Sequence, residues 1–158
     1  MQRVPMTPAG YEFVAAELER HKTVLRPQVI KAIEEARAHG DLSENAEYDA
    51  AKERQGQIAA RIRDYEDRVA RAEVIDVTTL PVSDRVVFGS TITIYDEAND
   101  EELQYRIVGV HEADVRRGLL SVESPIARAL LGCVTGDEAR VQAPRGLRVF
   151  EIVDVQYV

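Results

Sequence analysis

The chain has 158 residues, a formal net charge of -8 and one cysteine. Hydrophobic residues make up 45% and charged residues 30%, which is typical of a globular protein with one ordinary domain or two small ones. The acidic charge argues against binding of duplex nucleic acid through a broadly basic surface. One cysteine excludes an internal disulfide, and no apolar run approaches the ~20 residues that span a bilayer, so we expect a cytoplasmic protein without membrane contact.

The first half of the chain has helical periodicity. Thr7 and Pro8 form a helix start, with Thr7 as N-cap and proline in the first helical position. Apolar or small residues then recur three and four positions apart, as in one seam of a coiled coil. The seam of the first helix is Tyr11, Val14, Leu18, Leu25, Val29, Ala32 and Ala36, with His21 in one position. Pro27 falls inside this helix, where either a kink or a junction of two helices would accommodate it.

A second helical seam follows after a short turn. It comprises Ala51, Gln55, Ile58, Ile62, Tyr65, Val69 and Ala72. Gly40 can end the first helix in a left-handed conformation, and Asp41 can cap the second. Because the connection is short, the two helices must run antiparallel, as a hairpin roughly 45 Å long. Such a hairpin can satisfy its own seam, so we expect a monomer.

The second half of the chain predicts a small antiparallel sheet with one short helix. We divide the chain into an N-terminal coiled-coil hairpin (1–76), a linker (77–83) that contains Pro81, and a C-terminal domain (84–158). Ser124 and Pro125 indicate a helix start, with Ser124 as the N-cap and proline in the first helical position. A short helix follows over 126–131, and Gly132 ends it. The predicted strands are 85–95, 102–110, 118–122, 138–142 and 147–155. The fold class is therefore α+β.

The turn of the hairpin concentrates carboxylates. Asp41, Glu44, Glu47 and Asp49 lie within nine residues, and the i, i+3 spacing of Asp41 and Glu44 places them on one helical face. Two carboxylates can hold Mg²⁺ only with further ligands from elsewhere, because this ion prefers six oxygen ligands. The same spacing also fits a capping box at the start of a helix. Both interpretations stay open on spacing alone.

Basic residues flank this acidic tip. Arg37, Lys52 and Arg54 could lie beside an RNA backbone, or could simply pair with acids one helical turn away. The three histidines are scattered without metal-ligand spacing, and the sequence has no Gly-rich phosphate loop. The residues therefore indicate an acidic-tipped helical probe without a self-contained active site.

The tip sequence, residues 36–53, resembles the signature of the bacterial Gre family of transcript cleavage factors. The resemblance covers essentially the whole chain. Its further motifs are Met6-Thr7 with Gly10, Arg26-Pro27, Gln55-Gly56, Arg61-Ile62, 72–76, 105–109, 124–132 and 150–152.

This resemblance implies an accessory factor of RNA polymerase that is not itself an enzyme. The C-terminal domain, similar in fold to FKBP prolyl isomerases, would dock at the polymerase secondary channel, with Ser124 and Pro125 in the docking segment. The hairpin would enter the channel, where Asp41 and Glu44 would help to hold a catalytic Mg²⁺ shared with the polymerase.

The result would be cleavage of backtracked nascent RNA near its 3′ end. Arg37 and Lys52 match the family's basic patch, which would contact this RNA, although Lys52 stands where the family often has arginine. Two alternatives are a channel-binding inhibitor without cleavage activity, and a structural coiled-coil or FKBP-like interaction module.

Overall fold

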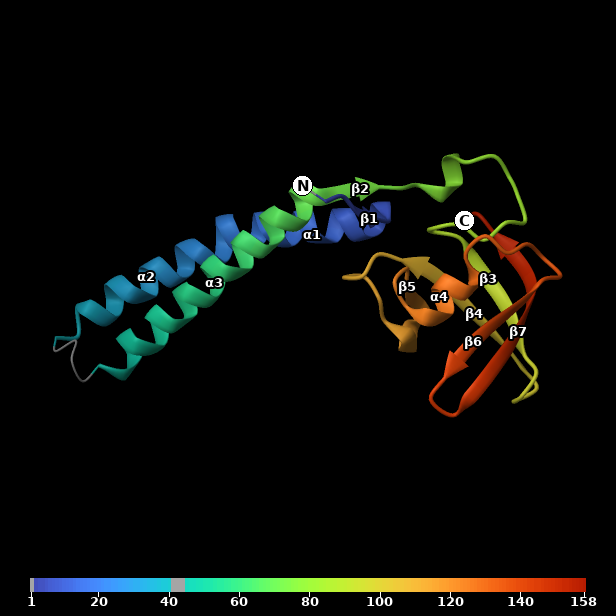
Figure 1. Cartoon of the computed structure of the whole chain (residues 1–158). Helices are drawn as coiled ribbons and strands as arrows, with labels where there is room; N and C mark the ends of the chain where they lie inside the picture. Colours follow the sequence, from blue (N-terminus) through green and yellow to red (C-terminus); the bar gives the residue numbers. More distant parts are fainter. Residues whose placement is uncertain (1, 41–44) are drawn as a thin grey trace. The chain divides into compact units, whose positions relative to one another are not determined.

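The helical half folds as a hairpin with two arms, coloured blue and green in Figure 1. The computed structural model describes residues 2–40 and 45–158. The first arm consists of α1 (Pro8–Arg20), a π-helical turn η1 (His21–Leu25) and α2 (Arg26–Arg37), and the second arm is α3 (Ala46–Arg71). The predicted pair of antiparallel helices is confirmed.

Helix α1 begins where the sequence indicates. Pro8 is its first residue, and the Thr7 hydroxyl accepts a hydrogen bond from the Gly10 N–H at 3.1 Å. This bond satisfies one of the backbone donors that a helix leaves free in its first turn. Thr7 is therefore the N-cap, as predicted.

Pro27 is accommodated by a junction between two helical segments. The π-helical turn η1 comes directly before α2, and Pro27 lies in the first turn of α2. A first-turn position costs little because the missing N–H of proline is not needed there. The seam after this turn differs from the prediction at one position. Val29 and Ala36 are buried as predicted, but Ile33 is buried between them, whereas the predicted seam residue Ala32 is only half-buried.

One apolar seam joins the two arms of the hairpin. Its centre is formed by Val29, Ile58 and Ile62, with Leu18 and Leu25 packed against them. Most of the predicted seam residues of α3 are buried, and Gln55 is half-buried. Burying this seam supplies the main driving force for pairing, since isolated helices gain little from propensity alone.

The second half forms a five-stranded sheet with the order β5-β4-β3-β7-β6. The strands are β3 (Thr91–Asp96), β4 (Glu101–Val108), β5 (Leu119–Ser121), β6 (Glu138–Ala143) and β7 (Gly146–Gln156). Neighbouring strands pair antiparallel except at one edge, where β5 runs parallel to β4. The prediction of a purely antiparallel sheet is wrong at this edge, because a 3-10 turn η4 (Val115–Arg117) lies within the crossover connection that leads to β5.

The sheet encloses an apolar core. Alternation along β3 directs Ile92 and Ile94 inward, where neither side chain has any exposed surface. Phe150 of β7 and Leu130 of the short helix α4 (Pro125–Leu130) complete this core. The predicted α+β class, a helical hairpin followed by a β domain, is therefore confirmed; the likeness of this domain to FKBP proteins stays a prediction.

A short ladder of two strands was not expected from the sequence. Strand β1 (Val4–Met6) pairs with β2 (Ala72–Val74), and the Ile75 N–H donates to the Met6 carbonyl at 2.9 Å. By packing, Tyr11–Ala72 belong to one unit, called here the hairpin unit. Val4–Gly10 and Glu73–Val158 belong to a second, called the sheet unit. Within the segment read as a linker, a 3-10 turn η3 (Val77–Thr79) buries Val77.

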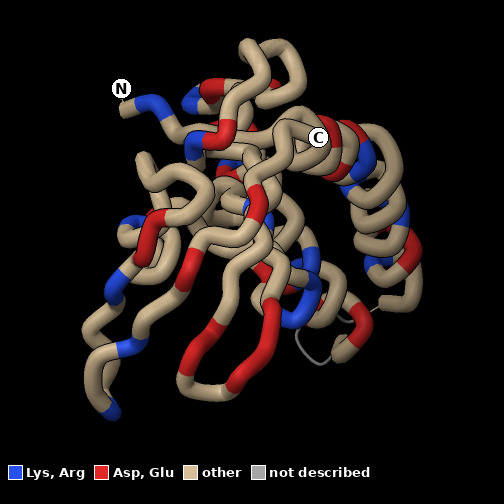
Figure 2. The backbone as a smooth tube through the Cα atoms, turned by 90° about the vertical axis from the view of Figure 1, so that its right-hand side faces the viewer, with Lys and Arg blue, Asp and Glu red and all other residues tan. Residues whose placement is uncertain are grey.

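A buried carboxylate organises the turn between β3 and β4. Asp96 accepts hydrogen bonds from the Arg148 guanidinium at 2.7 Å, the Asn99 amide at 2.9 Å and the Ala98 N–H at 3.1 Å. Burial would raise the pKa of this carboxyl, but the three donors outweigh it and hold the pKa below its ordinary value. Acidic residues are dense around this turn (Figure 2).

Along residues 2–40 and 45–158, every helix is too short or too polar to cross a bilayer.

Candidate functional site: the hairpin tip and its basic groove

The start of α3 is held by Asn45. Its side-chain oxygen accepts a hydrogen bond from the Tyr48 N–H at 3.1 Å, so Asn45 is the N-cap. The prediction that Asp41 caps this helix is wrong, because α3 begins at Ala46. Asp41 and Glu44, the predicted metal ligands, lie outside the described residues. The capping requirement of α3 is met without either carboxylate.

The same side chain also ties the two arms together. The Asn45 amide nitrogen donates to the Ala36 carbonyl at 2.7 Å. This carbonyl belongs to the last turn of α2, where backbone acceptors lack partners within the helix. One asparagine therefore satisfies a helix end on each side of the turn and fixes the spacing of the arms.

A second contact across the turn involves an acid of the predicted cluster. The Glu47 carboxylate lies 3.0 Å from Nδ1 of His39, and both side chains are largely exposed. Glu47 and Asp49 occupy the first turn of α3, where negative charge favours the positive end of the helix dipole. These two acids thus have local structural roles. The sequence spacing does not indicate this pair, because His39 and Glu47 lie eight residues apart.

The two predicted RNA-contacting residues have different surroundings. The Arg37 guanidinium lies over the ring of Tyr48, 5.9 Å from its centroid, which joins the end of α2 to the first turn of α3. The Lys52 ammonium donates to the side-chain oxygen of Gln55 at 3.2 Å. Both basic side chains are exposed. They remain available to an anionic partner, although no contact joins them directly in the described part of the hairpin.

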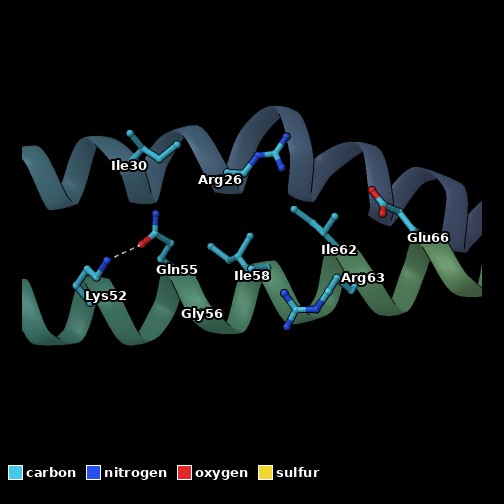
Figure 3. Close-up of a pocket in the computed structure, with 10 residues that line it drawn as sticks. Arg26, Ile30, Lys52, Gln55, Gly56, Ile58, Ile62, Arg63 and Glu66 are labelled. Carbon is cyan, nitrogen blue, oxygen red and sulfur yellow. Dashed lines mark hydrogen bonds between the residues drawn. The ribbon is translucent and has the colours of Figure 1, made fainter.

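Lys52 lines a groove between α2 and α3 (Figure 3). The groove has a volume of about 620 Å³, and Ile30, Ile58 and Ile62 supply its apolar surface. Its rim carries two further cations, Arg26 and Arg63. Gly56 leaves its side of the groove open, because a Cβ there would meet no atom within 4 Å. One acid, Glu66, also lines the groove, so its surface combines a net positive charge with apolar contact area.

The predicted docking residues form the start of α4. The Ser124 hydroxyl accepts from the Ala127 N–H at 3.2 Å and donates to the Ser121 carbonyl at 2.7 Å. Pro125 follows as the first helical residue and is exposed. The predicted cap is confirmed, and Pro125 is free on its outer side to contact a partner.

Within the described ranges, no group of three or more acidic, histidine or cysteine side chains is placed to hold a metal. The predicted metal ligands, Asp41 and Glu44, lie outside these ranges.

Comparison with known proteins gives matches over the whole chain. Residues 4–74 match the family model described as "Transcription elongation factor, N-terminal", and residues 81–157 match "Transcription elongation factor, GreA/GreB, C-term". The chain is 56% identical to transcription elongation factor GreA of Phenylobacterium zucineum (strain HLK1) and 53% identical to that of Caulobacter vibrioides (strain NA1000 / CB15N). Each comparison covers 100% of both chains.

Among solved structures, the chain is similar to GreA factor homolog 1 of Thermus thermophilus. The two are 29% identical over 98% of this chain and 99% of the other, with a TM-score of 0.44.

Proposed function

Because the chain belongs to the GreA/GreB family of transcription elongation factors, as its motifs indicated, we propose that it stimulates cleavage of backtracked RNA by RNA polymerase. The sheet unit docks at the secondary channel, and the hairpin enters it. Cleavage gives the nascent RNA a new 3′ end from which elongation resumes. The protein works in the cytoplasm as an accessory factor, and the polymerase provides the active site.

The observation that carries this proposal is that helix α3 is capped by Asn45 and not by the tip acids Asp41 and Glu44. Asn45 satisfies α3, so Asp41 and Glu44 are not required for the first turn of that helix. Two carboxylates that the helix does not need, at the turn of a long hairpin, favour a role toward a partner. Because Asn45 caps α3, the metal-ligand interpretation of Asp41 and Glu44 is favoured over the capping box.

The chemistry of the donor set fits Mg²⁺. This ion commonly takes one or two carboxylates and completes its six ligands with waters and substrate phosphates. Asp41 and Glu44 would hold it jointly with the polymerase, and the bound ion would activate a water for attack on the RNA. The two carboxylates contribute charge and orientation, and no ligand from the rest of this chain is needed.

The basic residues near the tip would hold the RNA backbone. Arg37 and Lys52 are exposed cations on the two arms, and the groove adds Arg26 and Arg63. Lys52 presents a compact charge without the two-pronged geometry of arginine. We therefore expect Lys52→Ala to weaken cleavage at limiting factor concentration, and Lys52→Arg to match or exceed the native protein.

Two variants of Ser124 can distinguish a direct contact with the polymerase from its role as the N-cap of α4. Ser124→Ala removes the cap, whereas Ser124→Asp keeps an oxygen that accepts from the Ala127 N–H. Loss of polymerase binding by both variants, with normal stability only in Ser124→Asp, would establish direct docking. Normal binding by Ser124→Asp would leave this serine as a cap alone.

The function is tested with halted, backtracked polymerase complexes that carry labelled RNA. Addition of the native protein with Mg²⁺ should shorten the RNA from its 3′ end well above the rate of polymerase alone. Binding that slows elongation without shortening the RNA would contradict the proposal and identify a channel-binding inhibitor. A peptide prolyl isomerisation assay checks the remaining alternative, an FKBP-like activity.

A further inference from the structure

A carboxylate in the sheet unit holds the residues that begin helix α1. Glu112 lies in the turn that follows β4, and it accepts hydrogen bonds from the Thr7 N–H at 3.1 Å and from the Gly109 N–H at 2.9 Å. Its second oxygen accepts from the Thr7 hydroxyl. We call this set of contacts the Glu112 clasp. It joins residues 105 positions apart in the sequence.

The clasp continues into the first turn of α1. The Thr7 hydroxyl that donates to Glu112 also accepts from the Gly10 N–H, so the bonds form a chain from helix to carboxylate. Hydrogen bonds arranged in this way polarise one another, and a charged acceptor makes them stronger than neutral ones. Thr7 is only 3% exposed, so water competes poorly for these groups. The negative charge also lies near the positive end of α1.

Two glycines allow the close approach that the clasp requires. A Cβ on Gly10 would collide with the Glu112 carboxyl group, and a Cβ on Gly109 would lie 2.5 Å from the Pro5 carbonyl oxygen. Neither glycine has a positive φ. Their small size, and not their backbone freedom, is therefore what this contact uses.

The clasp acts on the segment through which the hairpin is connected. Residues 4–10 and 73–75 lead into the two ends of the hairpin unit, and they are paired by β1 and β2. That ladder has only three residues in each strand, which is a weak attachment by itself. Glu112 adds a charged anchor from the turn after β4, so the first turn of α1 cannot move freely within the sheet unit.

We propose that Glu112 is a positioning residue, which anchors the start of α1 so that the hairpin tip reaches the polymerase active site in a reproducible position. This inference rests on the proposed function. Glu112 itself contacts neither RNA nor metal. Its loss should leave docking intact and lower the maximal rate of cleavage, because small misplacements of catalytic groups cost much of their effect.

The test compares Glu112→Ala with Glu102→Ala, which removes the same charge from an exposed position on β4. Amide hydrogen exchange of the full-length protein reports the clasp directly. In Glu112→Ala, the N–H groups of Thr7 and Gly109, which donate to the carboxylate, should exchange at least about tenfold faster, while the amides of β3 and β7 keep their protection. Unchanged exchange at Thr7 and Gly109 would overturn the clasp.

A second experiment measures the rate of RNA cleavage as a function of the concentration of this protein. Glu112→Ala should lower the rate at saturation roughly tenfold or more, with a half-saturating concentration within about twofold of the native protein. A variant that was only less stable would need more protein but reach the same maximal rate. Native cleavage at saturation, together with faster exchange, would overturn the positioning role.

Gly10→Ala provides a second variant that does not depend on removing the acid. Alanine favours helix more than glycine does, so α1 itself is not weakened, but the new Cβ displaces the Glu112 carboxylate. Its maximal rate should fall in the same direction as that of Glu112→Ala, and a native rate would contradict the proposal. If the native protein does not stimulate cleavage, the proposed function fails, and hydrogen exchange still decides whether Glu112 anchors α1.

Discussion

The sheet unit buries whole side chains, whereas the hairpin unit buries a single seam. Ile92, Ile94 and Ile152 have no exposed surface, while Ile58 and Ile62 in the hairpin are each 6% exposed and border an open groove. A sheet core resists change because every atom has packed neighbours. The hairpin leaves most of its surface to charged residues. We therefore expect stability to reside mainly in the sheet unit and the hairpin surface to be available for recognition.

The largest expected effect on stability comes from the sheet core. Phe150→Ala should lower the free energy of unfolding of the sheet unit by about 3–5 kcal/mol, because it leaves a cavity among fully buried residues. Denaturant unfolding followed by circular dichroism measures this loss. Leu147→Ala, at a position 55% exposed, is the matched control and should change little. Equal losses in the two variants would break the contrast between core and surface.

A core substitution in the hairpin should lower the free energy of unfolding by less. Ile58→Ala should cost about 2 kcal/mol, near the lower end for buried isoleucine, because water from the groove can occupy the space. Helix melting at 222 nm and hydrogen exchange in α2 and α3 measure it. A loss as large as that of Phe150→Ala would show that the hairpin seam is packed as tightly as the sheet core.

The buried Asp96 carboxylate gives the sheet unit a pH dependence. Because its pKa is lowered in the folded protein, the stabilisation is complete above the ordinary value of 3.8 and is lost as pH falls through the folded value. Asp96→Asn should be less stable than the native protein at pH 7, and the difference should shrink below about pH 4. Unfolding titrations at several pH values measure this slope, and a constant difference would contradict the assignment.

The cap of α3 has the smallest expected effect. Asn45→Ala should cost about 1 kcal/mol, since it removes the bond from the Tyr48 N–H and the bond to the Ala36 carbonyl, which keeps its second donor, the His39 N–H. Asn45→Asp keeps the cap and loses only the donor, so it separates the two contacts. Faster amide exchange at Tyr48 in the alanine variant alone is the expected pattern. The same rate in both variants would argue against the cap.

Local patterns in the sequence predicted most of the fold. The three-and-four spacing of Val14, Val29, Ile58 and Ile62 indicated the hairpin, because one buried stripe requires it. Ser124 and Pro125 identified α4 through their cap chemistry. The exchange of Ala32 for Ile33 in the seam could not be predicted, since either residue fits the three-and-four spacing between Val29 and Ala36.

Features made by distant residues were missed. The ladder of β1 and β2 joins three-residue strands too short for their own alternation to be recognised. The Glu112 clasp depends on a turn after β4 meeting Thr7, and nothing near either residue indicates the other. At the tip, Asp41-x-x-Glu44 fits a capping box, so the pattern predicted Asp41 as the cap of the second helix. The structure starts α3 at Ala46 with Asn45 as the N-cap, a residue that the prediction did not include.

The most direct test of the account uses one double variant, Asp41→Ala with Glu44→Ala. Its binding to RNA polymerase and its stimulation of cleavage are measured together on backtracked complexes across a range of Mg²⁺ concentrations. The account requires native binding and native helix content, with cleavage reduced to the rate of polymerase alone. Cleavage equal to that of the native protein would contradict it and would remove Asp41 and Glu44 from the chemistry.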